Sequence, residues 1–188
     1  ALLERLASEV ASPSKHETDR SEKIPRVERA SDLPVSFSQQ RLWFLDQLEP
    51  GSVAYHAQGA LRLRGALDIG VLRAGLNELV RRHESLRTSF FSRDGELRQV
   101  IRGPFELPLL ECDLENVSSD SWPGEIQAFA TRINGEPFDL TEGPLLRVAL
   151  IRLGASEHVL LLTIHHIITD GWSRGVFFEE LGTLYEAI

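Results

Sequence analysis

Two adjacent histidines, His165 and His166, stand at the end of the apolar run 159–164. An imidazole titrates near neutral pH, so it can accept or donate a proton during a reaction. The apolar run predicts a central, buried strand. Because side chains alternate across a strand, the two rings should point to opposite faces, where they cannot both bind one metal ion. The pattern therefore favours one imidazole in a cavity and the other in packing.

An acidic residue and a glycine follow the histidines, at the point where the strand should turn into a helix. Asp170 supplies a carboxylate, and Gly171 supplies a flexible backbone position. The start of the helix supplies free N–H groups in the same corner. This combination favours a reaction centre over a purely structural role for the histidines.

The composition argues against several other kinds of chemistry. The 188 residues include 42% hydrophobic residues, and 20 Lys and Arg against 28 Asp and Glu give a formal charge of -8. This surplus of acid argues against nucleic acid as a partner, and no apolar stretch reaches the roughly 20 residues that span a bilayer. Cys112, the single cysteine, lies in an apolar run that predicts a buried thiol rather than a nucleophile. A single cysteine cannot form a disulfide within the chain, so we expect a cytoplasmic protein. Because no Cys/His cluster has zinc-site spacing, we expect no bound metal.

Strands and helices in mixed order must position these residues, so the sequence predicts an α+β fold with a mixed or antiparallel sheet packed against helices. Hairpin turns are predicted at Asp94-Gly95 and at 154–157. The predicted strands are 55–63, 84–91, 107–112, 145–153 and 158–168. Four helices are predicted. The first is short, follows a capping box from Ser36 to Gln39 and is stopped by Pro50-Gly51. The others are a helix capped by Asp68 with its apolar stripe at 72–80, a helix from Ser121 to about 135, and a closing helix from about Ser173.

The amino-terminal part of the chain differs in composition from the rest. Apolar residues at helical spacing in 1–10 predict a short helix that ends a preceding domain. The polar stretch 11–32 predicts a linker, and the domain proper should occupy 33–188. Methionine is absent even at position 1, so we expect this chain to be a segment of a longer polypeptide.

Three stretches resemble motifs of one family in the expected order. Residues 165–171 (HHIITDG) match the HHxxxDG signature of the condensation domains of nonribosomal peptide synthetases and of chloramphenicol-acetyltransferase-like acyltransferases. Residues 36–45 (SFSQQRLWFL) resemble the opening motif of condensation domains, and residues 82–90 (RHESLRTSF) resemble their second motif. The resemblance covers 33–188 and implies the amino-terminal lobe of a domain about twice this long, with the chloramphenicol-acetyltransferase-like fold.

The resemblance implies amide-bond formation between substrates held on the phosphopantetheine arms of carrier domains, with no cofactor bound directly. His166 would face the reaction centre, either accepting a proton from the amine or hydrogen-bonding the tetrahedral intermediate. Asp170 would pair with an arginine and hold the loop, with Arg87 favoured over Arg82 and Arg41. Gly171 would permit the turn and offer its N–H to an oxyanion. His165 completes the motif.

The resemblance also implies partners and leaves alternatives open. Upstream and downstream peptidyl carrier domains, an adenylation domain and a second lobe would complete the synthetase, and this lobe alone should show little turnover. The opening motif is similar to the subtype that joins an L-configured donor to an L-configured acceptor, although His56 replaces the common asparagine after Tyr55. An epimerisation domain and a non-catalytic carrier-docking lobe are the other possibilities. We expect Trp43 and Trp172 to be packing residues.

Overall fold

Helices and strands are interspersed along the chain, and the strands form two separate sheets. The computed structural model describes residues 32–188. One sheet has four strands in the order β2-β7-β6-β5, and the other has three in the order β1-β4-β3. Two 3₁₀ helices, Glu84–Arg87 and Ser119–Ser121, add short turns. The strands and helices are β1 (Leu33–Pro34), α2 (Phe37–Leu48), β2 (His56–Arg64), α3 (Ile69–Arg82), β3 (Thr88–Arg93), β4 (Glu96–Ile101), β5 (Leu109–Asp113), α4 (Trp122–Gly135), β6 (Leu146–Gly154), β7 (Glu157–His165) and α5 (Gly171–Ala187).

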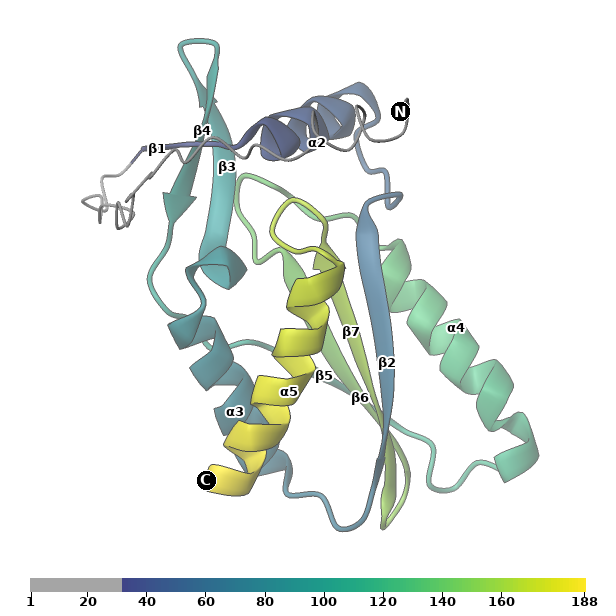
Figure 1. Cartoon of the computed structure of the whole chain (residues 1–188). Helices are drawn as coiled ribbons and strands as arrows, with labels where there is room; N and C mark the ends of the chain where they lie inside the picture. Colours follow the sequence, from purple (N-terminus) through teal and green to yellow (C-terminus); the bar gives the residue numbers. More distant parts are fainter. Residues whose placement is uncertain (1–31) are drawn as a thin grey trace, which may run out of the picture.

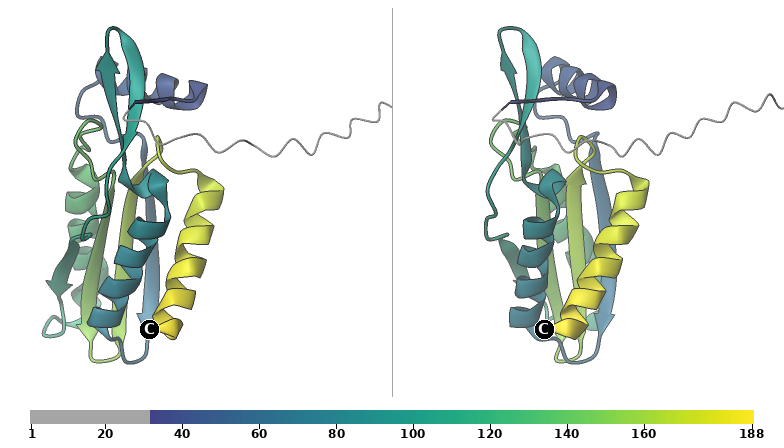
Figure 2. Two further views of the ribbon diagram at one scale, coloured as in Figure 1. Left: turned by 90° about the vertical axis from the view of Figure 1, so that its left-hand side faces the viewer. Right: turned by 60° about the vertical axis from the view of Figure 1, so that its left-hand side comes forward.

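The four-stranded sheet is mixed, and β7 is one of its central strands. β7 runs antiparallel to both β2 and β6, whereas β5 and β6 are parallel. Leu160 and Leu162 pack into the core under α3 and α5, and Leu161 packs on the opposite face under α4. Helices thus cover both faces of this sheet (Figures 1 and 2). A strand buried on both faces reads as a continuous apolar run, and the predicted central strand is confirmed.

The three-stranded sheet and α2 lie beyond the end of the large sheet at which β7 finishes (Figure 1). Ser36 and Gln39 form the predicted capping box, in which each side chain accepts a hydrogen bond from the backbone N–H of the other residue. No residue of α2 is buried. Leu42 and Trp43 pack half-buried against the core, while Phe37 is exposed. The α2 helix is therefore attached to the domain by one side only.

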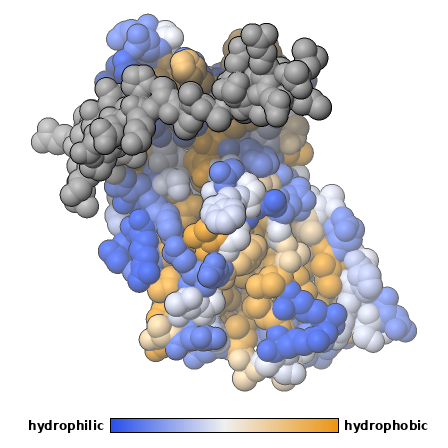
Figure 3. All heavy atoms as spheres, viewed as in Figure 1, coloured by the Kyte–Doolittle hydropathy of each residue, from blue (hydrophilic) through white to orange (hydrophobic). Residues whose placement is uncertain are grey.

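The surface shown in Figure 3 mixes hydrophobic and hydrophilic side chains. Leu61 belongs to the edge strand β2 and is 40% exposed, whereas its cross-strand partner Leu160 is 1% exposed. Within residues 32–188, no helix has both the length and the apolar character needed to cross a membrane. The helix predicted for 1–10 and nearly all of the linker predicted for 11–32 lie outside the described residues.

The predicted strand 84–91 was wrong in its first half. Residues Glu84–Arg87 form a 3₁₀ turn instead, and β3 begins at Thr88. Leu86 N donates to His83 O at 3.1 Å, and the Thr88 hydroxyl donates to Glu84 O at 2.8 Å, so local hydrogen bonds replace strand pairing. The predicted hairpin turn is confirmed, since Asp94 and Gly95 both have the positive φ that it requires.

Candidate active site

The two adjacent histidines occupy different environments where β7 ends. His165 is the last residue of the strand and is 2% exposed, whereas His166 begins the following turn and is exposed. The strand was predicted to continue to 168, but the chain leaves the sheet three residues earlier. Only His166 therefore offers its ring to a molecule arriving from solvent.

Three hydrogen bonds fix the turn that carries His166. The His166 N–H donates to Tyr55 O at 2.9 Å, just before β2 begins. The Ile167 N–H donates to the His165 ring atom Nδ1 at 3.1 Å, and the Ile168 N–H donates to His165 O at 3.1 Å. The turn is thus bound to the neighbouring strand and to the buried histidine, which restricts where His166 can lie.

His166 lies between two surface hollows. One is lined by polar groups that include Gln39, Thr88, Gln99 and Thr169. The other lies between α2 and the start of β2, and Arg41 and Tyr55 are among its lining residues. A solvent-accessible imidazole with space on two sides can exchange a proton with a reacting group placed in either hollow.

Among residues 32–188, Asp170 pairs with no arginine, so the predicted ion pair with Arg87, Arg82 or Arg41 was wrong. Asp170 is exposed and caps α5, because its carboxylate accepts hydrogen bonds from Ser173 N at 2.8 Å and Ser173 Oγ at 2.6 Å. These bonds hold the pKa of the Asp170 carboxyl below its usual value. The free N–H groups of the helix start supply what the arginine was expected to supply.

The three candidate arginines have other neighbours. Arg87 donates to the carbonyl of Arg102 and lies 3.9 Å from a carboxylate oxygen of Glu84. Arg82 pairs with Glu78 at 2.6 Å on the surface of α3. Arg41 is exposed on α2 and lines a hollow beside His166. Of the three, only Arg41 shares a hollow with His166.

The two residues after Asp170 differ from expectation. Gly171 begins α5 without a positive φ, and an added Cβ would meet no atom within 4 Å, so the described backbone does not require glycine there. Trp172 is 83% exposed and is not a packing residue, because the first turn of α5 projects it away from the core. Trp43, in contrast, packs against the core as predicted.

Burial controls the charge of His165. Loss of hydration lowers the pKa of the His165 ring to about 4, and repulsion from charge on His56 and His166 acts in the same direction. His165 is therefore neutral at neutral pH, which its Nδ1 requires in order to accept the hydrogen bond from Ile167. His165 supports the turn and is not placed to react.

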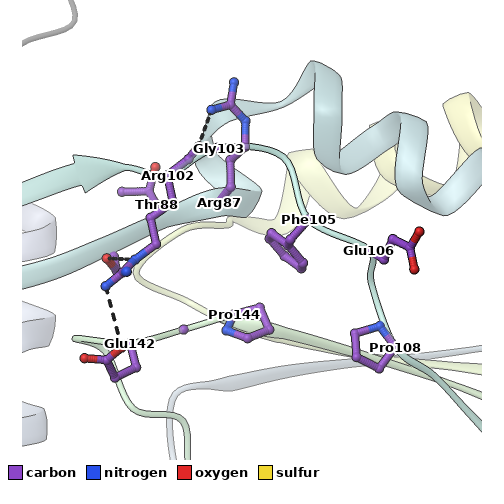
Figure 4. A pocket seen from close by; sticks show the side chains of 11 residues that line it. Arg87, Thr88, Arg102, Gly103, Phe105, Glu106, Pro108, Glu142 and Pro144 are labelled. Atoms are coloured by element: carbon purple, nitrogen blue, oxygen red, sulfur yellow. Dashed lines mark hydrogen bonds and ion pairs between the residues drawn. The ribbon is translucent and has the colours of Figure 1, made fainter.

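A separate cavity (Figure 4) shares the lining residue Thr88 with one of the two hollows beside His166. Phe105, Pro108 and Pro144 give it apolar walls, and the Arg102 guanidinium extends toward Glu142 at 3.9 Å. None of the histidines within 32–188 lines this cavity, so it is not the place where His166 could act.

Several site residues escaped prediction. The Tyr55 carbonyl holds His166, and the amide of Gln39 donates to Ile167 O at 3.4 Å, which links α2 to the turn. Arg174 on α5 donates to Gln58 O at 3.0 Å, and its Nε is buried without a hydrogen-bond partner in the described part of the chain. The capping box marks Gln39 in the sequence, but nothing local marks the other contacts.

Across 32–188, no group of three His, Cys, Asp or Glu side chains could hold a metal ion.

The family model and the similar proteins both point to one family. The family model for the condensation domain matches residues 29–188. One of the proteins that make up the linear gramicidin synthase of Brevibacillus parabrevis is 44% identical over 184 residues, which are 97% of this chain and 2% of that protein. Chondramide synthase of Chondromyces crocatus is 47% identical over 158 residues, which are 84% of this chain and 4% of that protein. The chain thus spans a few per cent of the length of these relatives.

Solved structures are similar over most of the described residues. The starter condensation domain of rhizomide synthetase has a TM-score of 0.77 at 26% identity, covering 84% of this chain and 39% of that one. The first condensation domain of the CDA synthetase has a TM-score of 0.76 at 27% identity, covering 83% and 40%. These likenesses confirm the predicted α+β, chloramphenicol-acetyltransferase-like fold, while the stereochemical subtype stays a prediction. The chain belongs to the condensation-domain family.

Proposed function

We propose that this chain is the part of a condensation domain that carries the reactive histidine for peptide-bond formation in nonribosomal peptide synthesis. The observation that carries the proposal is the exposed imidazole of His166, held at the end of β7 between two hollows. Two substrates that approach from different sides could both reach it. Relatives named as nonribosomal peptide synthetases support the same reaction.

The reaction joins an amine to a thioester. The nitrogen of an aminoacyl group attacks the thioester carbon of an acyl or peptidyl donor, and the carbon–sulfur bond breaks to release the donor thiol. His166 accepts the proton that the nitrogen loses, and this proton can then pass to the leaving sulfur. The N–H of Gly171, at the start of α5, is the proposed donor to the oxyanion.

The solved relatives offer one independent sign that His166 is the reactive histidine. Structures of the rhizomide starter domain include variants in which a histidine and an arginine eight positions apart were changed. In this chain Arg174 follows His166 at the same separation, whereas Ser173 occupies that place relative to His165. We infer that His166 and Arg174 are the counterparts of those two residues.

The proposed partners are carrier domains that bring the donor and the acceptor on phosphopantetheine arms, together with an adenylation domain and a second lobe. The chain covers 39% of the rhizomide starter domain, which leaves room for a second lobe facing His166. The proposed setting is the cytoplasm. We expect the 188-residue chain alone to form no detectable amide.

The test uses the complete domain with donor and acceptor loaded on carriers, and product is measured by mass spectrometry. His166→Ala should lower the rate of amide formation by roughly 10² to 10⁴ while carrier binding persists. His83→Ala is the control, because His83 pairs with Glu180 and lines neither hollow. Unchanged product formation in His166→Ala would indicate a docking lobe. Inversion at the α-carbon without a new amide would indicate an epimerisation domain.

A further inference from the structure

A cluster of buried rings lies behind the turn that carries His166. His56 begins β2, is 9% exposed, and pairs in register with His165 on β7. The centroid of its ring lies 4.7 Å from that of Phe138 and 6.1 Å from that of His165. Phe138 also meets the His165 ring edge-on at 6.3 Å. His56 and Phe138 thus both contact the ring that accepts the hydrogen bond from Ile167.

The hydrogen bonds assign opposite tautomers to the two buried imidazoles. His56 Nδ1 lies 3.0 Å from the carbonyl oxygen of Asn134, so this nitrogen carries the proton. His165 Nδ1 accepts from Ile167 N, so the proton of that ring is on Nε2. The His56 Nε2 is buried without a hydrogen-bond partner in the described range. His56 therefore faces the cluster as a flat ring and not as a hydrogen-bonding group.

We propose that His56 is a positioning residue for the reactive turn: by packing with Phe138 against His165, it holds the His165 ring with Nδ1 aimed at the Ile167 N–H. The inference rests on the proposed function only in taking His166 as the reactive group. A rotation of the His165 ring would break the bond to Ile167 and free the residue that follows His166. The ring contacts of His56 restrict that rotation.

The charges around the cluster make this arrangement sensitive to acid. The cation of Arg147 lies 3.9 Å from the ring centroid of Phe138, and Glu136 lies 4.0 Å from Arg147. Burial, and then the charge on Arg147, lowers the pKa of His56, although its hydrogen bond to Asn134 opposes this. His166 is the other titratable group that acts on His165. Protonation of His165 would place an N–H opposite the Ile167 N–H and end the hydrogen bond.

Amide hydrogen exchange in this 188-residue chain tests the proposal without an activity assay. In His56→Ala we expect the Ile167 amide to exchange at least about 10-fold faster, while the Leu161 amide in the centre of β7 keeps its rate. In His56→Phe, which keeps a ring but cannot bond Asn134, the Ile167 amide should stay protected. In His56→Asn, which can bond Asn134 but has no ring, it should lose protection.

Three outcomes would overturn the proposal: unchanged Ile167 exchange in His56→Ala, rescue by Asn and not by Phe, or an equal loss of protection at Ile167 and Leu161. If His56→Ala does not fold, the comparison of Phe with Asn decides the question by itself. A second readout is the pKa of the His165 ring by ¹⁵N NMR, which should rise in His56→Phe because repulsion from His56 is removed. The exchange experiment tests the role of His56 in the turn, whereas the His166→Ala assay tests the proposed function. Either proposal can therefore be contradicted while the other is supported.

Discussion

His165 and His166 are neighbours in the chain but belong to two different regions of the molecule. His165 lies in the four-stranded sheet, among side chains that are almost all apolar and buried. His166 lies at the boundary where that sheet meets α2, a helix with no buried residue. The buried region fixes geometry through packing, and the boundary leaves one imidazole open to solvent. The difference shows how a single step along the backbone separates a buried, supporting side chain from the exposed one that is proposed to react.

The largest expected effect is on the stability of the buried region. Leu160→Ala should lower the free energy of unfolding by about 2 to 5 kcal/mol, because it leaves a cavity between the sheet and its helices. Leu61→Ala is the matched control, since Leu61 lies directly opposite on β2 but is 40% exposed, and it should cost less than about 1 kcal/mol. Chemical denaturation measures both. Equal losses would mean that the edge strand is as tightly packed as the centre.

Acid should weaken the buried region through His165. The folded-state pKa of about 4 lies below the ordinary 6.5, so the unfolded chain binds more protons between these values. Stability is therefore fully present above pH 6.5 and declines as the pH falls toward 4, by no more than about 3 kcal/mol. Carboxylates with a lowered pKa, such as that of Glu78, affect the free energy of unfolding only below about pH 4.5. Unfolding measured from pH 7 to 4.5 should show this slope in the native chain and a reduced slope in His165→Phe.

The two histidines should differ in their effect on stability at neutral pH. His165→Phe removes the acceptor of the buried Ile167 N–H, and we expect a loss of about 1 to 3 kcal/mol. His166→Phe changes an exposed side chain, and stability should stay within about 0.5 kcal/mol. Parallel urea titrations give both values. A larger loss in His166→Phe than in His165→Phe would reverse the assignment of support and chemistry.

A small effect on stability, in the opposite direction, is expected at the start of α5. Gly171→Ala should be neutral or stabilising by up to about 1 kcal/mol, since Gly171 is helical and a Cβ there meets nothing. In the complete domain, however, the added methyl group would occupy space beside the proposed oxyanion donor, so amide formation should slow. Thermal unfolding and a product assay on the same variant test both statements. Full activity would show that substrate does not use this space.

Local patterns predicted the parts of the fold whose signals are local. The apolar run of β7, the turn at Asp94-Gly95 and the capping box of Ser36 and Gln39 each depend on a few neighbouring residues, and each was confirmed. The prediction of an arginine partner for Asp170 was wrong, because the sequence does not show whether helix N–H groups or a distant arginine will hydrogen-bond a carboxylate. The exposure of Trp172 and the contacts of His56 depend on how separate elements pack, which no local pattern encodes.

Selective modification of imidazoles tests the central claim most directly. In the complete domain, diethyl pyrocarbonate should acylate His166 and leave His165 unmodified, and the fraction of His166 modified should equal the fraction of amide-forming activity lost. Peptide mass spectrometry locates the modified rings, and a bound donor thioester analogue should slow modification at His166 only. The account would be contradicted if His165 reacted first, or if activity persisted with His166 fully modified.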